Sequence, residues 1–233
     1  MESLEAELAR ARDLDEAELA DAIQAIGFEC TRCGACCTAE APAADASDEG
    51  DGADEDHTAT VFPDEVRRLR AAAEGAADWR DVARPMPYGL EPGPDGPAGE
   101  TFEWALQTDD CGDCVFYAEG DGDARGRCTV HGDRPLVCRT YPFSVALGGT
   151  SQPTGEAVDR SGLVRAHECE GLGRDIDRSA AADLAAALKA RAVRDLEEAI
   201  AVRDGYEPTA PAEGEVVVHD SEGAKRPDGR PLS

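Results

Sequence analysis

The chain carries Cys30-Thr31-Arg32-Cys33-Gly34-Ala35-Cys36-Cys37, a stretch in which four thiols fall within eight residues. A C-x2-C loop allows two thiolates to converge on one cation, while backbone N–H groups of the turn point at the sulfurs. Gly34 permits the tight turn inside this loop. Buried structural cysteines behave as small apolar side chains and do not need such clustering. The spacing therefore predicts a metal centre that organises the fold.

Cys36 and Cys37 are adjacent in the sequence, and the side chains of neighbouring residues usually diverge. We therefore expect two metal sites, or one cluster with several metal atoms, rather than one tetrahedral ion bound by both thiols. The other thiols are Cys111, Cys114, Cys128, Cys138 and Cys169. Nine thiols are one more than two four-thiolate sites would use. His131 and His167 lie beside Cys128 and Cys169 and could bind zinc through an imidazole nitrogen, but with so many thiolates available we favour a supporting or solvent-facing role for both.

The charge balance is strongly acidic, with 50 Asp and Glu against 23 Lys and Arg and a formal net charge of -27. Such a chain repels phosphate backbones and anionic lipids, so we expect neither nucleic acid nor a membrane as a partner. Lysine occurs only at Lys189 and Lys225. An acidic excess with scarce lysine is typical of halophilic proteins, because the Debye length of about 3 Å at 1 M salt screens self-repulsion. An acidic interaction tail is the alternative, but the acids are spread along the whole chain.

The sequence contains no apolar run near the roughly 20 residues that are needed to span a bilayer. Its first residues, Met1 to Glu5, are acidic and lack the basic and apolar regions of a secretory signal. We therefore expect a cytoplasmic protein. Because the cytoplasm of most organisms keeps thiols reduced, nine cysteines favour metal or redox chemistry over a disulfide framework.

Hydrophobic periodicity predicts helices at both ends of the chain. Residues 1–27 form a helical segment, either as one kinked helix or as two short ones, with Gly27 placed to end it. A long helix from about 178 to 202 occupies the segment 174–205, with Gly205 as its stop. The tail at 206–233 is rich in Pro, Gly and Glu, and we expect disorder there, although Val216 to Val218 could add an edge strand.

A loop-rich metal-binding domain is expected at residues 28–173, between the terminal helices. Residues 39–57 are too polar and acidic to bury a core, which predicts an inserted acidic loop. A short extended piece at 60–62 is followed by a helix at 63–73. Residues 84–99 carry Pro and Gly at almost every second position and predict a loop.

Bulky residues predict the strands of this domain. Residues 101–106 form one strand, and the runs 115–117 and 128–131 flank a Gly- and Asp-rich turn and pair as a β-hairpin. Aromatic residues make up only 5% of the chain, so the apolar core is modest and bound metal would add stability. The expected fold is α+β, a small loop-rich, metal-organised domain with a short β-hairpin, flanked by N- and C-terminal helices.

Taken together, the cysteine-containing stretches resemble the YkgJ family, the CxxCxxCC group of zinc- or iron-chelating domains that are often labelled Fe–S cluster oxidoreductases. The resemblance is carried in order by residues 28–37, by Cys114-Val115-Phe116, by residues 128–143 and by residues 169–173, and it covers roughly 28–173. It implies eight metal ligands: Cys30, Cys33, Cys36, Cys37, Cys114, Cys128, Cys138 and Cys169. Cys111 lies outside the pattern and is interpreted as a spare thiol, although Cys111-x2-Cys114 is itself a chelating spacing.

Two arginines near the last cysteines have two possible roles. Arg134 and Arg139 would offset thiolate charge and donate hydrogen bonds to sulfur. The alternative is that both form ordinary surface ion pairs with nearby Asp.

The sequence leaves the function of the metal open. In one hypothesis the ions hold the domain together, since zinc at thiolates supplies on the order of 10 kcal/mol of folding free energy. In the other, Cys30, Cys33 and Cys36 have the C-x2-C-x2-C spacing of iron–sulfur proteins, although no fourth Cys follows at the ferredoxin position. No phosphate loop, dinucleotide fingerprint or activated nucleophile indicates an enzyme. We expect a metal-binding protein carrying a zinc ion or an iron–sulfur cluster, and alternatively an oxidoreductase or electron-transfer protein acting on an unknown protein or redox partner.

Overall fold

The computed structural model describes residues 2–39, 56–94, 96–120, 126–147, 157–159 and 162–232. The chain forms two compact units, each built from two segments that are distant in the sequence. Unit 1 consists of Met1–Thr31 and Pro135–Tyr206, and unit 2 consists of Arg32–Arg134 and Glu207–Ser233. The α+β class with N- and C-terminal helices is confirmed. The units nevertheless cut across the expected segments, because both terminal helical segments fold together with residues 135–173.

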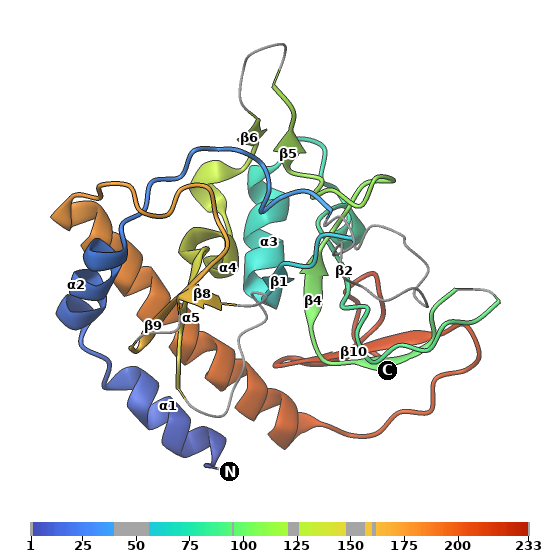
Figure 1. Cartoon of the computed structure of the whole chain (residues 1–233). Helices are drawn as coiled ribbons and strands as arrows, with labels where there is room; N and C mark the ends of the chain where they lie inside the picture. The colour runs from blue at the N-terminus through green and yellow to red at the C-terminus, as the bar shows by residue number, and fades with distance from the viewer. Residues whose placement is uncertain are drawn as a thin grey trace, which may run out of the picture. The chain divides into compact units, whose positions relative to one another are not determined.

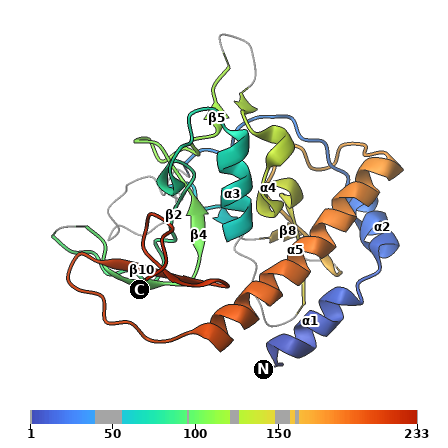
Figure 2. The same cartoon turned by 180° about the vertical axis from the view of Figure 1, so that it is seen from behind.

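Unit 1 is built around one long helix, α5 (Arg178–Gly205), which confirms the helix expected there. The helices α1 (Leu4–Arg12), α2 (Glu16–Ile26) and α4 (Leu136–Thr140) pack against it. Figures 1 and 2 show this packing from opposite sides. The inner face of α5 consists mainly of alanine and leucine, with Ala181, Ala185 and Leu188 fully buried. Small side chains on this face let the neighbouring helices approach closely.

Polar caps make the N-terminal segment two helices rather than one. The Ser3 side chain accepts a hydrogen bond from the Ala6 N–H at the start of α1, and Asp15 accepts from the N–H groups of Ala17 and Glu18 at the start of α2. Gly27 ends α2 with a φ of 78°, as expected. Each helix therefore begins or ends where its local side-chain chemistry requires.

A three-stranded antiparallel sheet completes unit 1, and the sequence analysis did not predict it. Its strands are β7 (Phe143–Val145), β8 (Ala157–Asp159) and β9 (Val164–His167), in the order β7-β9-β8. The ring of Phe143 packs edge-on against that of Phe28, with 5.6 Å between the centroids. This contact ties the sheet to the segment that leads into the cysteine run.

The described part of unit 2 contains one α-helix and several short strands. Its elements up to residue 106 are β1 (Thr60–Val61), α3 (Pro63–Ala72), the 3₁₀ helix η1 (Trp79–Asp81), β2 (Ala83–Pro85), β3 (Gly99–Thr101) and β4 (Trp104–Leu106). The extended piece and the helix after it are confirmed, and Pro63 occupies the first turn of that helix. The strand expected over 101–106 is wrong in its extent. It is two strands, because β4 lies between β1 and β2 while β3 pairs with a strand of the C-terminal segment.

The C-terminal tail folds, so the expectation of disorder is wrong. The strands β10 (Val216–Asp220) and β11 (Gly223–Lys225) form an antiparallel hairpin, and β10 pairs in parallel with β3. All five residues of β10 are buried. The valine run supplies apolar surface, and β3 supplies the hydrogen-bonding partner that the composition of the tail could not reveal.

The remaining elements of unit 2 lie next to cysteines. The strands β5 (Tyr117–Ala118) and β6 (Arg127–Cys128) pair antiparallel, which confirms the predicted β-hairpin but not the bounds of its strands. The strand expected over 128–131 ends at Cys128, and the 3₁₀ helix η2 (His131–Asp133) follows. Residues 121–125 of the predicted turn and residues 40–55 of the predicted acidic loop lie outside the described residues. None of the helices in the described ranges is long and apolar enough to cross a bilayer.

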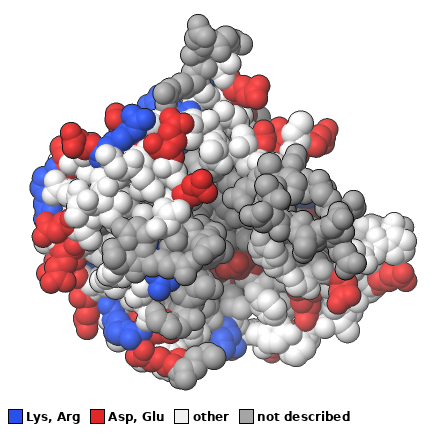
Figure 3. Space-filling model, viewed as in Figure 1, with Lys and Arg blue, Asp and Glu red and all other residues white. Residues whose placement is uncertain are grey.

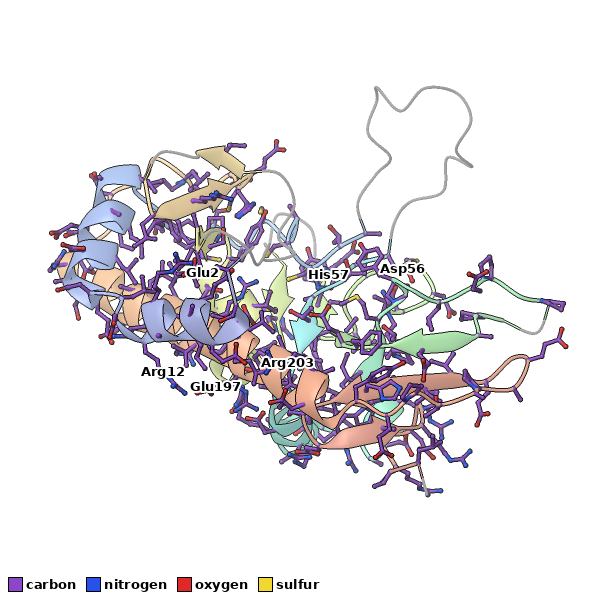
Figure 4. All side chains as sticks on the ribbon, turned by 90° about the horizontal axis from the view of Figure 1, so that it is seen from below. Glu2, Arg12, Asp56, His57, Glu197 and Arg203 are labelled. Atoms are coloured by element: carbon purple, nitrogen blue, oxygen red, sulfur yellow. The ribbon has the colours of Figure 1, made fainter. Side chains whose placement is uncertain are left out.

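Acidic side chains are spread over the described surface in the view of Figure 3, with basic side chains, Lys or Arg, interspersed. In unit 1 some of them pair across helices. Arg12 of α1 lies 2.8 Å from Glu197 of α5, and both residues are labelled in Figure 4. Arg203 of α5 lies 2.6 Å from Glu5 of α1. Both pairs are solvent-exposed, so each contributes on the order of 1 kcal/mol or less.

Candidate metal centre

The structure divides the nine cysteines between the two units. Unit 2 contains Cys33, Cys36, Cys37, Cys111, Cys114 and Cys128, and unit 1 contains Cys30, Cys138 and Cys169. The boundary between the units therefore runs through the first C-x2-C pair.

In unit 2 the cysteine run forms a tight turn. The Cys37 N–H donates to the Gly34 carbonyl at 2.7 Å, and Gly34 has a φ of 90°. The turn brings the Sγ atoms of Cys36 and Cys37 to 3.9 Å from each other. Two thiolates bound to one tetrahedral zinc ion at about 2.3 Å each would lie about 3.8 Å apart. The two adjacent side chains thus converge, and the expectation that they diverge is wrong.

The segments that carry Cys114 and Cys128 are tied to this turn through the backbone. The Cys114 N–H donates to the Cys37 carbonyl at 2.8 Å, and the Tyr117 N–H donates to the Cys114 carbonyl at 2.8 Å. Tyr117 lies directly opposite Cys128 in the β5–β6 pair. Four thiols of unit 2 are therefore held on neighbouring backbone segments that come from three parts of the sequence.

Burial and neighbouring charges shift the pKa values of these thiols. Burial, with smaller contributions from the neighbouring Cys128 and Cys36, raises the pKa of Cys114 to about 11. Burial likewise raises the pKa of Cys128, with Arg134 opposing and Cys36 adding to the effect. The hydrogen bond with Cys37, followed by burial of the sulfur, raises the pKa of Cys36 far above its ordinary value, although part of the residue is exposed. Raised pKa values favour the protonated thiols as long as no metal is bound. A bound cation reverses this, because coordination deprotonates a thiol.

Tyr117 lies beside the same group of thiols. Burial raises the pKa of its hydroxyl, and the charges of Glu119, Cys37, Asp113 and Cys33 add to the effect. The sequence analysis placed this tyrosine in the hairpin and assigned it no role in the site. No local sequence pattern could have indicated such a role, because the glycines that lie against its ring, Gly34 and Gly126, are not its neighbours in the sequence.

The donor set of unit 2 fits a thiophilic metal. Thiolates select zinc or iron over magnesium and calcium. Among the described residues, no three His, Cys, Asp or Glu side chains are already gathered around one point that suits an ion. The thiols of Cys36 and Cys37 already lie close together. The thiols of Cys114 and Cys128 are carried by segments whose backbone is linked to that turn by hydrogen bonds. The ion itself would gather the complete set, as it does in domains whose folding is coupled to metal binding.

In unit 1 the backbones at Cys30 and Cys169 run side by side. Phe28 and Leu172 form an isolated antiparallel β-bridge, and the Glu29 N–H donates to the Gly171 carbonyl at 3.0 Å. The Gly171 N–H in turn donates to the Sγ of Cys169 at 3.4 Å. An N–H group aimed at sulfur is the kind of contact that orients thiolate ligands.

The third thiol of unit 1, Cys138, lies on α4. The Tyr141 hydroxyl, just after this helix, donates to the carbonyl of Glu168 next to Cys169. Arg191, buried in α5, donates to the Thr140 hydroxyl at 3.1 Å and so fixes α4 from the other side. No described contact tests whether all eight expected ligands share a centre, so that assignment stays a prediction.

Cys111 occupies an exposed turn of unit 2. Its N–H donates to the Asp109 carboxylate at 2.8 Å, and the next residue, Gly112, accepts from the His57 N–H at 2.8 Å. Burial lowers the pKa of His57, labelled in Figure 4, to about 4. The interpretation of Cys111 as a spare thiol stays a prediction.

The two histidines near the cysteines differ in their surroundings. His167 is buried, with its Nε2 2.8 Å from the Ser144 hydroxyl. His131 is exposed, and burial together with the charges of Arg134 and Arg32 lowers its pKa. The charge of Arg134 also acts to lower the pKa of Cys36 and of Cys128, and its role at the site stays a prediction.

The sequence model of one protein family, CxxCxxCC, described as "Putative zinc- or iron-chelating domain", matches residues 29–170. Neither the curated proteins nor the solved structures contain a match to the chain. The matched range includes all eight cysteines expected as ligands. The β10–β11 hairpin lies outside it.

Proposed function

This chain belongs to the CxxCxxCC family of zinc- or iron-chelating domains, and from that premise we propose that unit 2 binds one zinc ion through Cys36, Cys37, Cys114 and Cys128. The distance of 3.9 Å between the Sγ atoms of Cys36 and Cys37 carries the proposal, because it matches the span of two thiolates on one tetrahedral ion. Zinc or an iron–sulfur cluster is the cofactor class that the family indicates.

The proposed role of the ion is structural. Four protein thiolates fill a tetrahedral coordination sphere and leave no position for a substrate. The Gly34 turn presents two of the thiols, and the hydrogen bond from the Cys114 N–H to the Cys37 carbonyl holds the third nearby. Cys128 enters from β6. Bound zinc would join three backbone segments of a unit whose strands are only two to five residues long.

The wider assignments of the sequence analysis remain part of this proposal. Cys30, Cys33, Cys138 and Cys169 are further candidate ligands, and a reducing compartment such as the cytoplasm would keep all the thiols available for metal. Catalysis of oxidoreduction through an iron–sulfur cluster, on a protein or redox partner, is the alternative outcome. No contact among the described residues favours it.

Metal analysis tests the proposal directly. We expect anaerobically purified full-length protein to be colourless and to contain stoichiometric zinc by elemental analysis. The variants Cys36→Ser and Cys114→Ser should each lose at least one equivalent, because a hydroxyl is a poor replacement for a thiolate on zinc. The matched control is Cys111→Ser, which changes an exposed thiol of the same unit and should keep its zinc.

Two outcomes would contradict the proposal. Unchanged metal content in the Cys36→Ser and Cys114→Ser variants would exclude these thiols as ligands. If the protein is brown and contains iron and acid-labile sulfide, its cofactor is an iron–sulfur cluster and not zinc. That result would favour the redox alternative.

A further inference from the structure

We propose that Tyr117 is a positioning residue whose ring sets the spacing between the thiol-bearing segments of unit 2, with Gly34 and Gly126 providing the space for it. This inference rests on the proposed metal site. It concerns a side chain that is not itself a ligand.

The ring of Tyr117 occupies the space where two glycines lack side chains. A Cβ atom on Gly34 would lie 2.7 Å from the Tyr117 Cζ, and one on Gly126 would lie 2.6 Å from it. The hydroxyl oxygen would be closer still in both cases. These separations are far below the optimal carbon–carbon distance of about 3.5 to 4.0 Å. Both glycines are buried, so ring and backbone are packed without space for one further methyl group.

These contacts connect the segments that carry the four proposed ligands. Gly34 lies in the turn that presents Cys36 and Cys37, and its carbonyl accepts the Cys37 N–H. Gly126 directly precedes β6, which ends at Cys128. Tyr117 itself is opposite Cys128 and bonded through its N–H to the Cys114 carbonyl. One side chain therefore separates the turn from the strand at a fixed distance.

The hydroxyl end of the Tyr117 ring lies nearest both glycines, so substitutions that remove this end test the inference. The atoms closest to a new methyl group on Gly126 would be the Tyr117 hydroxyl, Cε2 and Cζ. Leucine has none of these atoms. Gly126→Ala should therefore collide with tyrosine at position 117 and be tolerated when leucine is there. Phenylalanine keeps the whole ring and lacks only the hydroxyl, so it should largely preserve the spacing.

The experiment measures the rate at which zinc passes from the full-length protein to a chromogenic chelator. Changes to residues that orient ligands typically alter metal affinity by 10- to 100-fold, so we expect Tyr117→Ala and Gly126→Ala each to accelerate release about tenfold or more. Tyr117→Phe should stay within about threefold of the unsubstituted protein on this scale. In a Tyr117→Leu background, the further change Gly126→Ala should have little additional effect.

Two control variants separate local strain from the proposed role. Gly132→Ala introduces a methyl group where no atom lies within 4 Å, and Tyr88→Ala removes a tyrosine that is 62% exposed. Both positions belong to unit 2, and neither variant should change zinc release.

The possible results separate this inference from the function on which it rests. If the unsubstituted protein binds no zinc, the proposed function fails. If it binds zinc and Gly126→Ala releases it at the same rate, or if the effects of Gly126→Ala and Tyr117→Leu simply add, the inference about Tyr117 is overturned while the metal site stands. Should Tyr117→Ala not fold, the Leu and Phe variants still provide the test.

Discussion

Lys225 buries its ammonium group inside unit 2. Its Nζ donates to Asp220 at 2.7 Å and to Glu222 at 2.8 Å, and Asp220 also accepts from the Trp104 indole at 2.8 Å. The side chains of Lys225 and Asp220 are only 5% and 2% exposed. One of the two lysines in this arginine-rich chain is thus committed to the hairpin that was expected to be disordered.

Replacing this lysine should destabilise unit 2. Lys225→Met leaves the Asp220 carboxylate buried without its cation, and breaking a buried pair in this way costs about 3 to 5 kcal/mol. Urea unfolding followed by circular dichroism measures the loss. The control is Arg230→Met, because Arg230 is 81% exposed and only 3.6 Å from Asp228 at the surface, so its loss should cost about 1 kcal/mol or less. Equal losses in the two variants would contradict the buried-pair interpretation.

At the residue scale, cysteine spacing is sufficient to predict the candidate site but not its geometry. The thiols form a recognisable pattern because chelation requires close spacing. The convergence of Cys36 and Cys37 could not be predicted, because it depends on the φ angle of Gly34 and on the hydrogen bond that closes its turn. Tyr117 was missed because its contacts join positions 34 and 126, which no local pattern relates.

Among the elements, α2 shows how one backbone position ends a helix. Gly27 combines a φ of 78° with a ψ of 138°, a region that only glycine adopts readily. A Cβ there would also lie 2.5 Å from the Arg174 carbonyl oxygen. The N–H of Gly173 meanwhile donates to the Gly27 carbonyl at 3.0 Å. The end of α2 is therefore fixed by a second segment as well as by its own cap.

Gly27→Ala should consequently destabilise unit 1 more than backbone strain alone. Strain of this kind costs about 1 to 3 kcal/mol, and displacement of the Arg174 backbone adds to it. Gly173→Ala is the matched control in the same unit, since Gly173 has a φ of 75° but open space around its Cβ position. Thermal unfolding should give a lower midpoint for Gly27→Ala than for Gly173→Ala. Indistinguishable midpoints would show that the close approach to Arg174 is unimportant.

Some elements are visible in the sequence and others are not, and the reason is physical. Long helices such as α5 bury one stripe, and that periodicity is visible in the sequence. The strand β7 has three residues that are all buried, so it shows no alternation. The run 101–106 looks like one strand because its composition is uniform, yet the chain changes partners after Thr101. Pairing choices of this kind depend on segments far away in the sequence.

On the scale of the whole molecule, the division into two units could not be predicted from the order of the segments. Each unit is assembled from two separate stretches, and the link between Thr31 and Arg32 falls inside the cysteine run. Charge, by contrast, is a property of composition and could be predicted fully. The formal net charge of -27 means that most acidic side chains have no basic residue available to neutralise them.

This excess charge predicts how stability depends on salt. Screening weakens the repulsion among the acids, which favours the folded state, but it also weakens ion pairs such as Arg12–Glu197 and Arg203–Glu5. Exposed pairs contribute on the order of 1 kcal/mol or less each, whereas self-repulsion involves every unneutralised carboxylate. We therefore expect the unfolding midpoint to rise as KCl increases from about 0.1 to 1 M, over which the Debye length falls from about 10 to 3 Å.

The same measurement at lower pH separates screening from other effects of salt. Free carboxylates titrate near pH 4, so at about that pH much of the negative charge is lost and repulsion no longer dominates. If screening is the cause, the gain in midpoint between low and high KCl should shrink there in both units. An equal gain at both pH values would indicate that KCl acts through apolar burial. A fall in midpoint with salt at pH 7 would mean that ion pairs dominate, and the hypothesis of a halophilic protein would then be wrong.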